Sequence, residues 1–70
     1  MKLWIARDKD NSLSISNYKL VYAGIIQGWT LPKEYYDDGN SFHVYIDDKS
    51  FPEVTFENSP MEVELKLVEK

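Results

Sequence analysis

A chain of 70 residues without cysteine is expected to form one small domain, over residues 1–70, that holds neither a disulfide nor a thiolate metal site. Its 12 acidic and 8 basic residues give a net charge of −4, and the bases are scattered along the chain. Nucleic-acid binding needs a clustered basic stripe, and a membrane span needs a long apolar run. We therefore expect a cytoplasmic protein that binds neither nucleic acid nor membrane.

Two stretches near the N-terminus alternate apolar and polar side chains with a period of two, which is typical of β-strands. Lys2–Arg7 predicts a strand with apolar residues on both faces, and this favours a central position in a sheet. Ser12–Asn17 predicts a second strand, with Leu13 and Ile15 on the apolar face and three serines on the polar face. The turn-forming residues 8–11 between them complete a predicted β-hairpin.

The middle of the chain is less regular. Tyr18–Ile26 is a mixed apolar stretch that predicts a third strand, with Gly24 indicating a bulge and Gly28 marking its exit. The following segment, Thr30–Asn40, is compatible with a single helical turn over Lys33–Tyr36 or with an irregular loop.

The C-terminal half predicts further strands. Phe42–Asp47 predicts a strand with Phe42, Val44 and Ile46 on the apolar face and His43 on the wetter one. Glu53–Glu57 predicts a short edge strand, and Met61–Val68 a final strand. The whole pattern is all-β, with at most one helical turn. It predicts four to six antiparallel strands in a small twisted sheet or a half-closed barrel, with one face buried and the other wet.

No motif in the chain carries catalytic or metal-binding chemistry. Asp8-Lys9-Asp10-Asn11-Ser12 has the first oxygens of a calcium loop but lacks the glycine and glutamate that complete one. The aspartate pairs 37–38 and 47–48 are interpreted as solvated turn residues rather than a glycosidase acid and base. His43, the single histidine, cannot form a standard zinc site. We expect a protein that is not an enzyme and that uses no cofactor and no metal.

Aromatic and acidic residues lie together in the least regular part of the chain. The candidate interaction residues are Trp29, Glu34, Tyr35, Tyr36, Asp37 and Asp38. Tyrosine and tryptophan are enriched in interface hot spots, and loops often carry function, although the same aromatics also suit the minor core of a small domain. If exposed, these residues form an aromatic and acidic surface that suits a basic protein partner.

Two segments near the ends of the chain carry a resemblance to known sequences: Leu3–Asp10 with Leu13, and Phe51–Pro60 with Glu62–Leu65. They resemble a group of short proteins found in gut bacteria, their phages and mobile elements. Asn11 stands where that group usually has a glycine, and residues 18–50 have no counterpart. The group has no assigned activity, so the resemblance implies no functional residue. It implies a small cytoplasmic protein encoded by a phage or mobile element.

Three functions remain open at this point. The first is a non-enzymatic acidic module that binds another protein, and for a phage or mobile element this would be a modulator of a host protein. The second is a homodimeric structural protein, formed when an exposed edge such as Glu53–Glu57 or the last strand pairs with its twin. The third is a small-ligand-binding barrel in which Trp29 or Tyr45 stacks on a planar ligand.

Overall fold

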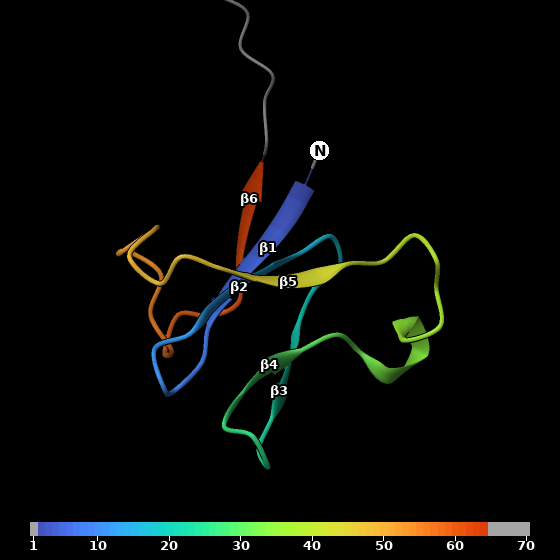
Figure 1. Ribbon diagram of the computed structural model, residues 1–70, viewed down its shortest axis with the longest axis horizontal. Helices are drawn as coiled ribbons and strands as arrows, with labels where there is room; N and C mark the ends of the chain where they lie inside the picture. The colour runs from blue at the N-terminus through green and yellow to red at the C-terminus, as the bar shows by residue number, and fades with distance from the viewer. Residues whose placement is uncertain (1, 65–70) are drawn as a thin grey trace, which may run out of the picture.

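The computed structural model describes residues 2–64, and within them it forms two antiparallel sheets (Figure 1). The larger sheet has four strands in the order β5-β2-β1-β6. These strands are β1 (Lys2–Arg7), β2 (Leu13–Ser16), β5 (His43–Ile46) and β6 (Met61–Glu64). The smaller sheet pairs β3 (Val21–Ala23) with β4 (Gly28–Thr30), and one 3₁₀ turn, η1 (Lys33–Tyr35), precedes β5. The all-β prediction is therefore confirmed, as a pair of open sheets.

The register of the larger sheet brings the apolar positions of its strands onto one face. β1 lies between β2 and β6, as its two apolar faces predicted. Ile5 of β1 lies opposite Ile15 of β2 on one side and Met61 of β6 on the other. Ile15 in turn lies opposite Val44 of β5. Since side chains alternate along a strand, residues that are paired across the sheet share a face.

The core sits on this face. Ile5 and Leu13 are fully buried there with Val54, which comes from the long segment between β5 and β6. Burying each such aliphatic side chain contributes about 1.5–3 kcal/mol. Partly buried hydrophobic residues surround this cluster, namely Ile15, Ile46, Met61 and Val63.

The predicted edge strand at Glu53–Glu57 is wrong. The segment forms turns, in which the Val54 N–H donates to the Phe51 carbonyl and the Asn58 side chain donates to the Glu53 carbonyl. Val54 is buried because this segment covers the core, and not because it pairs with a strand. The last predicted strand is confirmed over Met61–Glu64, and residues 65–68 of that prediction lie outside the described residues.

The single strand predicted at Tyr18–Ile26 is also wrong, because the chain reverses within it. The Gln27 N–H donates to the Gly24 carbonyl, and Gln27 has a φ of 49°. β3 ends before this turn and β4 begins after it, so Gly24 lies in the turn rather than in a bulge and Gly28 opens a strand. Of the two alternatives left open for Thr30–Asn40, the structure has the single helical turn, η1, over Lys33–Tyr35.

The second face of the larger sheet is not the wet face that the alternation predicted. Ala6, Ser14 and Ser16 are fully buried on it. β4 packs against β1, and the Lys9 N–H donates to the Gln27 carbonyl in the turn that joins β3 to β4. The β3–β4 hairpin therefore forms a second layer, and the centre of the larger sheet is covered on both faces.

Candidate functional site

The structure divides the six candidate interaction residues between two places. Trp29 lies on β4 and packs with Tyr22 and Phe56, its ring centroid 5.5 Å and 6.4 Å from theirs. The Trp29 ring nitrogen is buried and has no hydrogen-bond partner among the described residues. Trp29 therefore anchors the β3–β4 hairpin and does not contribute an open contact surface.

Two other candidate residues stabilise the segment around η1. Tyr35 stacks on Tyr18 with ring centroids 4.0 Å apart and an interplanar angle of 5°. The Tyr18 hydroxyl donates to the Asp38 carboxylate at 3.0 Å, and this hydrogen bond raises the pKa of Tyr18 above its ordinary value. The Ser41 hydroxyl bonds the carbonyls of Tyr35 and Asp38, each at 2.9 Å. We call residues 33–41 the η1 lobe, and these contacts hold it beside the start of β5.

The remaining candidates are exposed. Glu34, Tyr36 and Asp37 are all exposed on the η1 lobe, and Tyr36 keeps 58% of its surface accessible. In Figure 1 the lobe lies to one side of the larger sheet, beyond the start of β5. The predicted aromatic and acidic surface is therefore smaller than expected, but it contains one exposed tyrosine with two acids.

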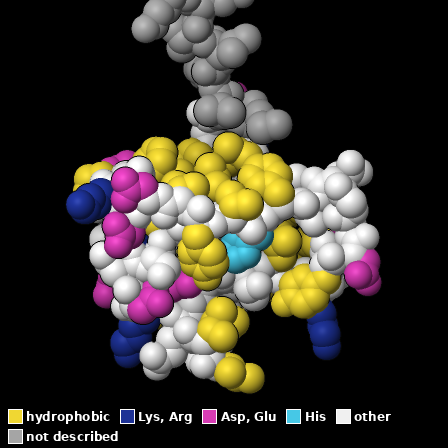
Figure 2. Space-filling model, viewed as in Figure 1, with side chains coloured by type: hydrophobic (Ala, Val, Ile, Leu, Met, Phe, Trp, Pro, Cys, Tyr) yellow, Lys and Arg dark blue, Asp and Glu magenta, His cyan; other side chains and the backbone are white. Residues whose placement is uncertain are grey.

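A second exposed group lies on β5 and at Phe42, the residue before it, and of this group the sequence analysis had singled out only Tyr45. Phe42, Val44 and Tyr45 are 37%, 49% and 57% exposed. Val44 does share a face with Ile15, as the alternating pattern predicted, but the expected burial of Phe42 and Val44 is wrong because β5 is the outermost strand. Figure 2 shows hydrophobic side chains gathered around the histidine on this side of the molecule.

The face of β5 that carries Tyr45 is joined to the rest of the fold by the buried carboxylate of Asp8. Asp8 accepts hydrogen bonds from the Trp29 N–H at 2.9 Å and from the Tyr45 hydroxyl at 3.0 Å. Burial, and then the hydrogen bond to Asp8, raises the pKa of Tyr45. Asp8 thus links β1, β4 and β5.

His43 lies on the face that the alternation predicted to be wet, but it is not fully exposed there. Its side chain is partly buried beside Tyr45, and its Nε2 atom has no hydrogen-bond partner in the described part of the chain. Burial lowers the pKa of His43, and the negative charge of Asp8 opposes that shift. The ring is therefore held mainly in its neutral form at pH 7.

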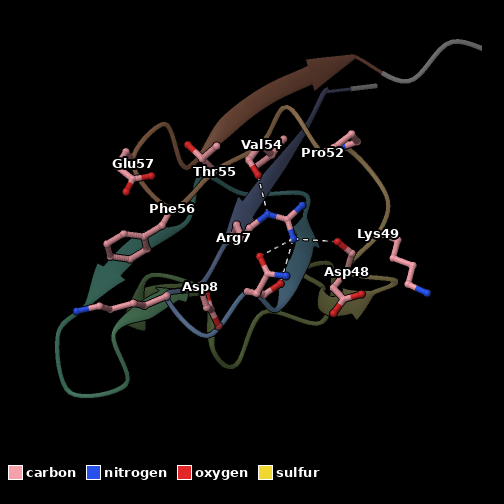
Figure 3. Close-up of a pocket in the computed structure, with 11 residues that line it drawn as sticks. Arg7, Asp8, Asp48, Lys49, Pro52, Val54, Thr55, Phe56 and Glu57 are labelled. Atoms are coloured by element: carbon pink, nitrogen blue, oxygen red, sulfur yellow. Dashed lines mark hydrogen bonds between the residues drawn. The ribbon is translucent and has the colours of Figure 1, made fainter.

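A cavity of about 430 Å³ lies beside the turn that joins β1 to β2 (Figure 3). The residues that line it include Arg7, Asp48, Val54 and Phe56. Arg7 is only 8% exposed, and its Nε donates to the Val54 carbonyl at 2.6 Å. Apart from a bond from Nη1 to the Asn11 side-chain oxygen at 3.5 Å, the other guanidinium hydrogen bonds also reach backbone oxygens. The acceptors are the carbonyls of Asn11, Asp48, Ser50, Phe51 and Val54.

This set of acceptors defines the role of Arg7. A guanidinium has five N–H donors, and each of its three nitrogens donates to at least one of the five carbonyls. Arg7 thus fastens the segment after β5 to the first hairpin, and it has little remaining capacity to bind a ligand. The sequence contained a signal for this role, because Arg7 is in phase with the buried residues Leu3 and Ile5.

Among residues 2–64, no three or more His, Asp or Glu side chains lie close enough together to hold a metal ion. Within the same residues, no helix has the length and apolar character needed to cross a membrane. No protein-family model, curated protein or solved structure matches this chain. Its function must therefore be inferred from its own residues.

Proposed function

We propose that this protein is a small non-enzymatic interaction module that binds another protein through β5 and the η1 lobe. We call this region the β5 surface. Its members are Glu34, Tyr36, Asp37, Phe42, Val44 and Tyr45. The observation that carries the proposal is the exposure of apolar and aromatic side chains on an outermost strand, next to an exposed tyrosine and two acids. Isolated exposed apolar residues are common, whereas several of them gathered at one edge of a sheet indicate a contact site.

The composition of the β5 surface fits an interface. Large aromatic side chains such as Tyr36 and Tyr45 bury much area at low entropic cost, which is why tyrosine is enriched in hot spots. The chain exposes 5184 Å² in total. A standard interface covers about 800 Å² on each partner, roughly a sixth of that surface. A partner seated on β5 and the lobe would therefore also contact their immediate neighbours.

Charge indicates the nature of the partner. The protein has a net charge of −4, and Glu34 and Asp37 are exposed within the β5 surface. Opposite charges at the rim of an interface mainly accelerate association and select among partners. A basic partner is therefore favoured, and its binding is expected to weaken as salt is raised.

The test is a comparative capture experiment with three baits. The baits are the wild type, a Tyr36→Ser/Val44→Thr variant of the β5 surface, and an Ile25→Ser/Ile26→Ser control at the tip of the β3–β4 hairpin. The control residues are matched because they are also exposed apolar side chains, 101% and 58% accessible. Circular dichroism verifies that all three baits are folded.

Each bait is exposed to lysate from the cells that produce the protein, at low and at high salt. We expect one stoichiometric protein to be retained by the wild type and the hairpin control, lost by the β5-surface variant, and reduced at high salt. Retention of the same proteins by all three baits would contradict the proposal. So would the absence of any stoichiometric protein at either salt concentration.

A further inference from the structure

We propose that the partner adds an extended segment to the open edge of β5, as an antiparallel strand with an apolar centre and basic ends. This inference rests on the proposed function and specifies how the partner is bound. In strand addition, backbone hydrogen bonds provide affinity, and the side chains on each face provide specificity.

The backbone groups at the edge of β5 are oriented for such an addition. Within residues 2–64, β5 pairs with β2 on one side and with no strand on the other. The Phe42 N–H donates to the side chain of Asn17, the residue that directly follows β2, so this N–H points toward β2. Because the direction alternates along a strand, the N–H and C=O groups of His43 and Tyr45 point toward the open edge.

β5 lacks the features that normally protect an edge strand. Natural sheets guard their edges with charged residues, prolines or bulges. The opposite edge strand, β6, carries Glu62 and Glu64. The four residues of β5, His43–Ile46, include no charged residue at pH 7 and no proline. Of the two edges, β5 is therefore the one suited to accept another strand.

On both faces of the sheet, exposed apolar side chains at β5 can pack against the side chains of an added strand. Val44, with Phe42 just before the strand, projects to one face and Tyr45 to the other, and all three are exposed. Directly opposed side chains on neighbouring strands lie close enough to pack, and pairs of aromatic and β-branched residues are favourable. An incoming segment with alternating β-branched residues matches this edge.

The charges beside β5 indicate basic ends on the incoming segment. Residues 33–38, before the strand, contain three carboxylates and one lysine, and residues 47–49, after it, contain two carboxylates and one lysine. Figure 1 shows these two segments leaving opposite ends of β5. A second copy of this chain is a poorer occupant, because two-fold antiparallel pairing places the acidic end of one β5 beside the acidic lobe of the other.

The probe is a labelled synthetic peptide, Lys-Lys-Val-Thr-Val-Thr-Val-Lys-Lys, and its control carries glutamate at each lysine. Fluorescence anisotropy measures the affinity. We expect the basic peptide to bind and the acidic peptide to bind at least about tenfold more weakly, because its ends face carboxylates. The Asp37→Asn/Asp48→Asn variant should bind the basic peptide about threefold more weakly. The matched Glu62→Gln/Glu64→Gln variant at the other edge should bind it as the wild type does.

Residue-level amide hydrogen exchange shows where the peptide lies. The amides of His43 and Tyr45 should become protected in the complex, whereas those of Glu62 and Glu64 should not. An absence of binding up to about 1 mM basic peptide overturns the inference. Protection at β6 overturns it as well, and so does a free dimer by light scattering with His43 and Tyr45 already protected.

These outcomes separate the two proposals. Peptide bound without protection at His43 and Tyr45 rules out strand addition. The proposed function then still stands if capture depends on Tyr36 and Val44. Protection at His43 and Tyr45 together with a failed capture experiment supports the open edge but contradicts a cellular partner at the β5 surface.

Discussion

Replacing Arg7 tests the most densely connected interaction of this fold. Arg7→Met keeps an apolar stem of similar length and removes every guanidinium donor. The five backbone carbonyls that it engages lie in the first turn and in residues 48–54. The variant should therefore loosen the segment that carries Val54 over the core.

The hydrogen bonds of Arg7 determine how much unfolding free energy the Arg7→Met variant should lose. The bond from Nε to the Val54 carbonyl is buried, so its loss leaves a buried acceptor unpaired, at a cost of about 1–3 kcal/mol. The other four carbonyls are only partly buried, and water can replace part of what they lose. Together we expect about 3–5 kcal/mol, since these bonds act as one network. A domain of this size has a total unfolding free energy of about 4–10 kcal/mol, so Arg7→Met should be close to unfolded.

Two further variants make the measurement interpretable. Arg7→Lys retains the charge but not the planar fork, and we expect a loss of about 2–3 kcal/mol. Lys9→Met removes a neighbouring exposed charge and should change stability by less than about 0.5 kcal/mol. Urea unfolding followed by the fluorescence of Trp4 and Trp29 gives each value. An Arg7→Met variant as stable as Lys9→Met would refute the assignment of Arg7 as the organiser of this segment.

Two predictions concern Asp8 and its surroundings. A Cβ at Gly28 would lie 2.5 Å from the Asp8 Cγ, so Gly28→Ala should lower the free energy of unfolding in urea by about 1–3 kcal/mol. Gly39→Ala, where the space is open, should be nearly neutral. Equal effects of the two substitutions would show that Asp8 does not pack against Gly28. Burial lowers the pKa of His43 below 6.5, so between pH 6.5 and that lower value the unfolded chain binds more protons. The contribution of His43 to stability is therefore complete above pH 6.5 and decreases as the pH falls. The His43→Gln variant should lose less stability on acidification than the wild type does. A wild type that gains stability relative to the variant on acidification would contradict the buried, neutral ring.

The strands that could be predicted are those with a clear period of two. Lys2–Arg7 became β1, and its apolar character on both faces correctly indicated a central strand. The same pattern predicted β2 and β5, which pair with each other, to within a residue at each end. In each case the signal is local, because adjacent side chains must face opposite sides of the sheet.

The β3–β4 hairpin could not be predicted for a physical reason. Its turn contains Ile25 and Ile26, which are exposed, and the apolar run therefore resembled a buried strand. Gln27 has a positive φ, which is uncommon for a residue other than glycine and could not be predicted from its side chain. The hairpin packs against β1 as a second layer, so its absence from the prediction also produced the error about the wet face.

The candidate site depended on information that no local pattern contains. The exposure of Val44 follows from the order of the strands, which is set by pairing between segments far apart in the sequence. The stacking of Tyr35 on Tyr18 is similarly non-local and removed one predicted contact residue from the surface. Glu34, Tyr36 and Asp37 remained exposed because η1 is short and lies outside the sheet.

The open edge of β5 is the feature on which the proposed mode of binding depends, and amide hydrogen exchange of the free protein at low concentration tests it most directly. The amides of Val44 and Ile46 should be protected by β2, while those of His43 and Tyr45 should exchange at rates close to those of an unstructured chain. If all four amides are protected to the same extent, another segment already covers the edge, and the account of the β5 surface is wrong.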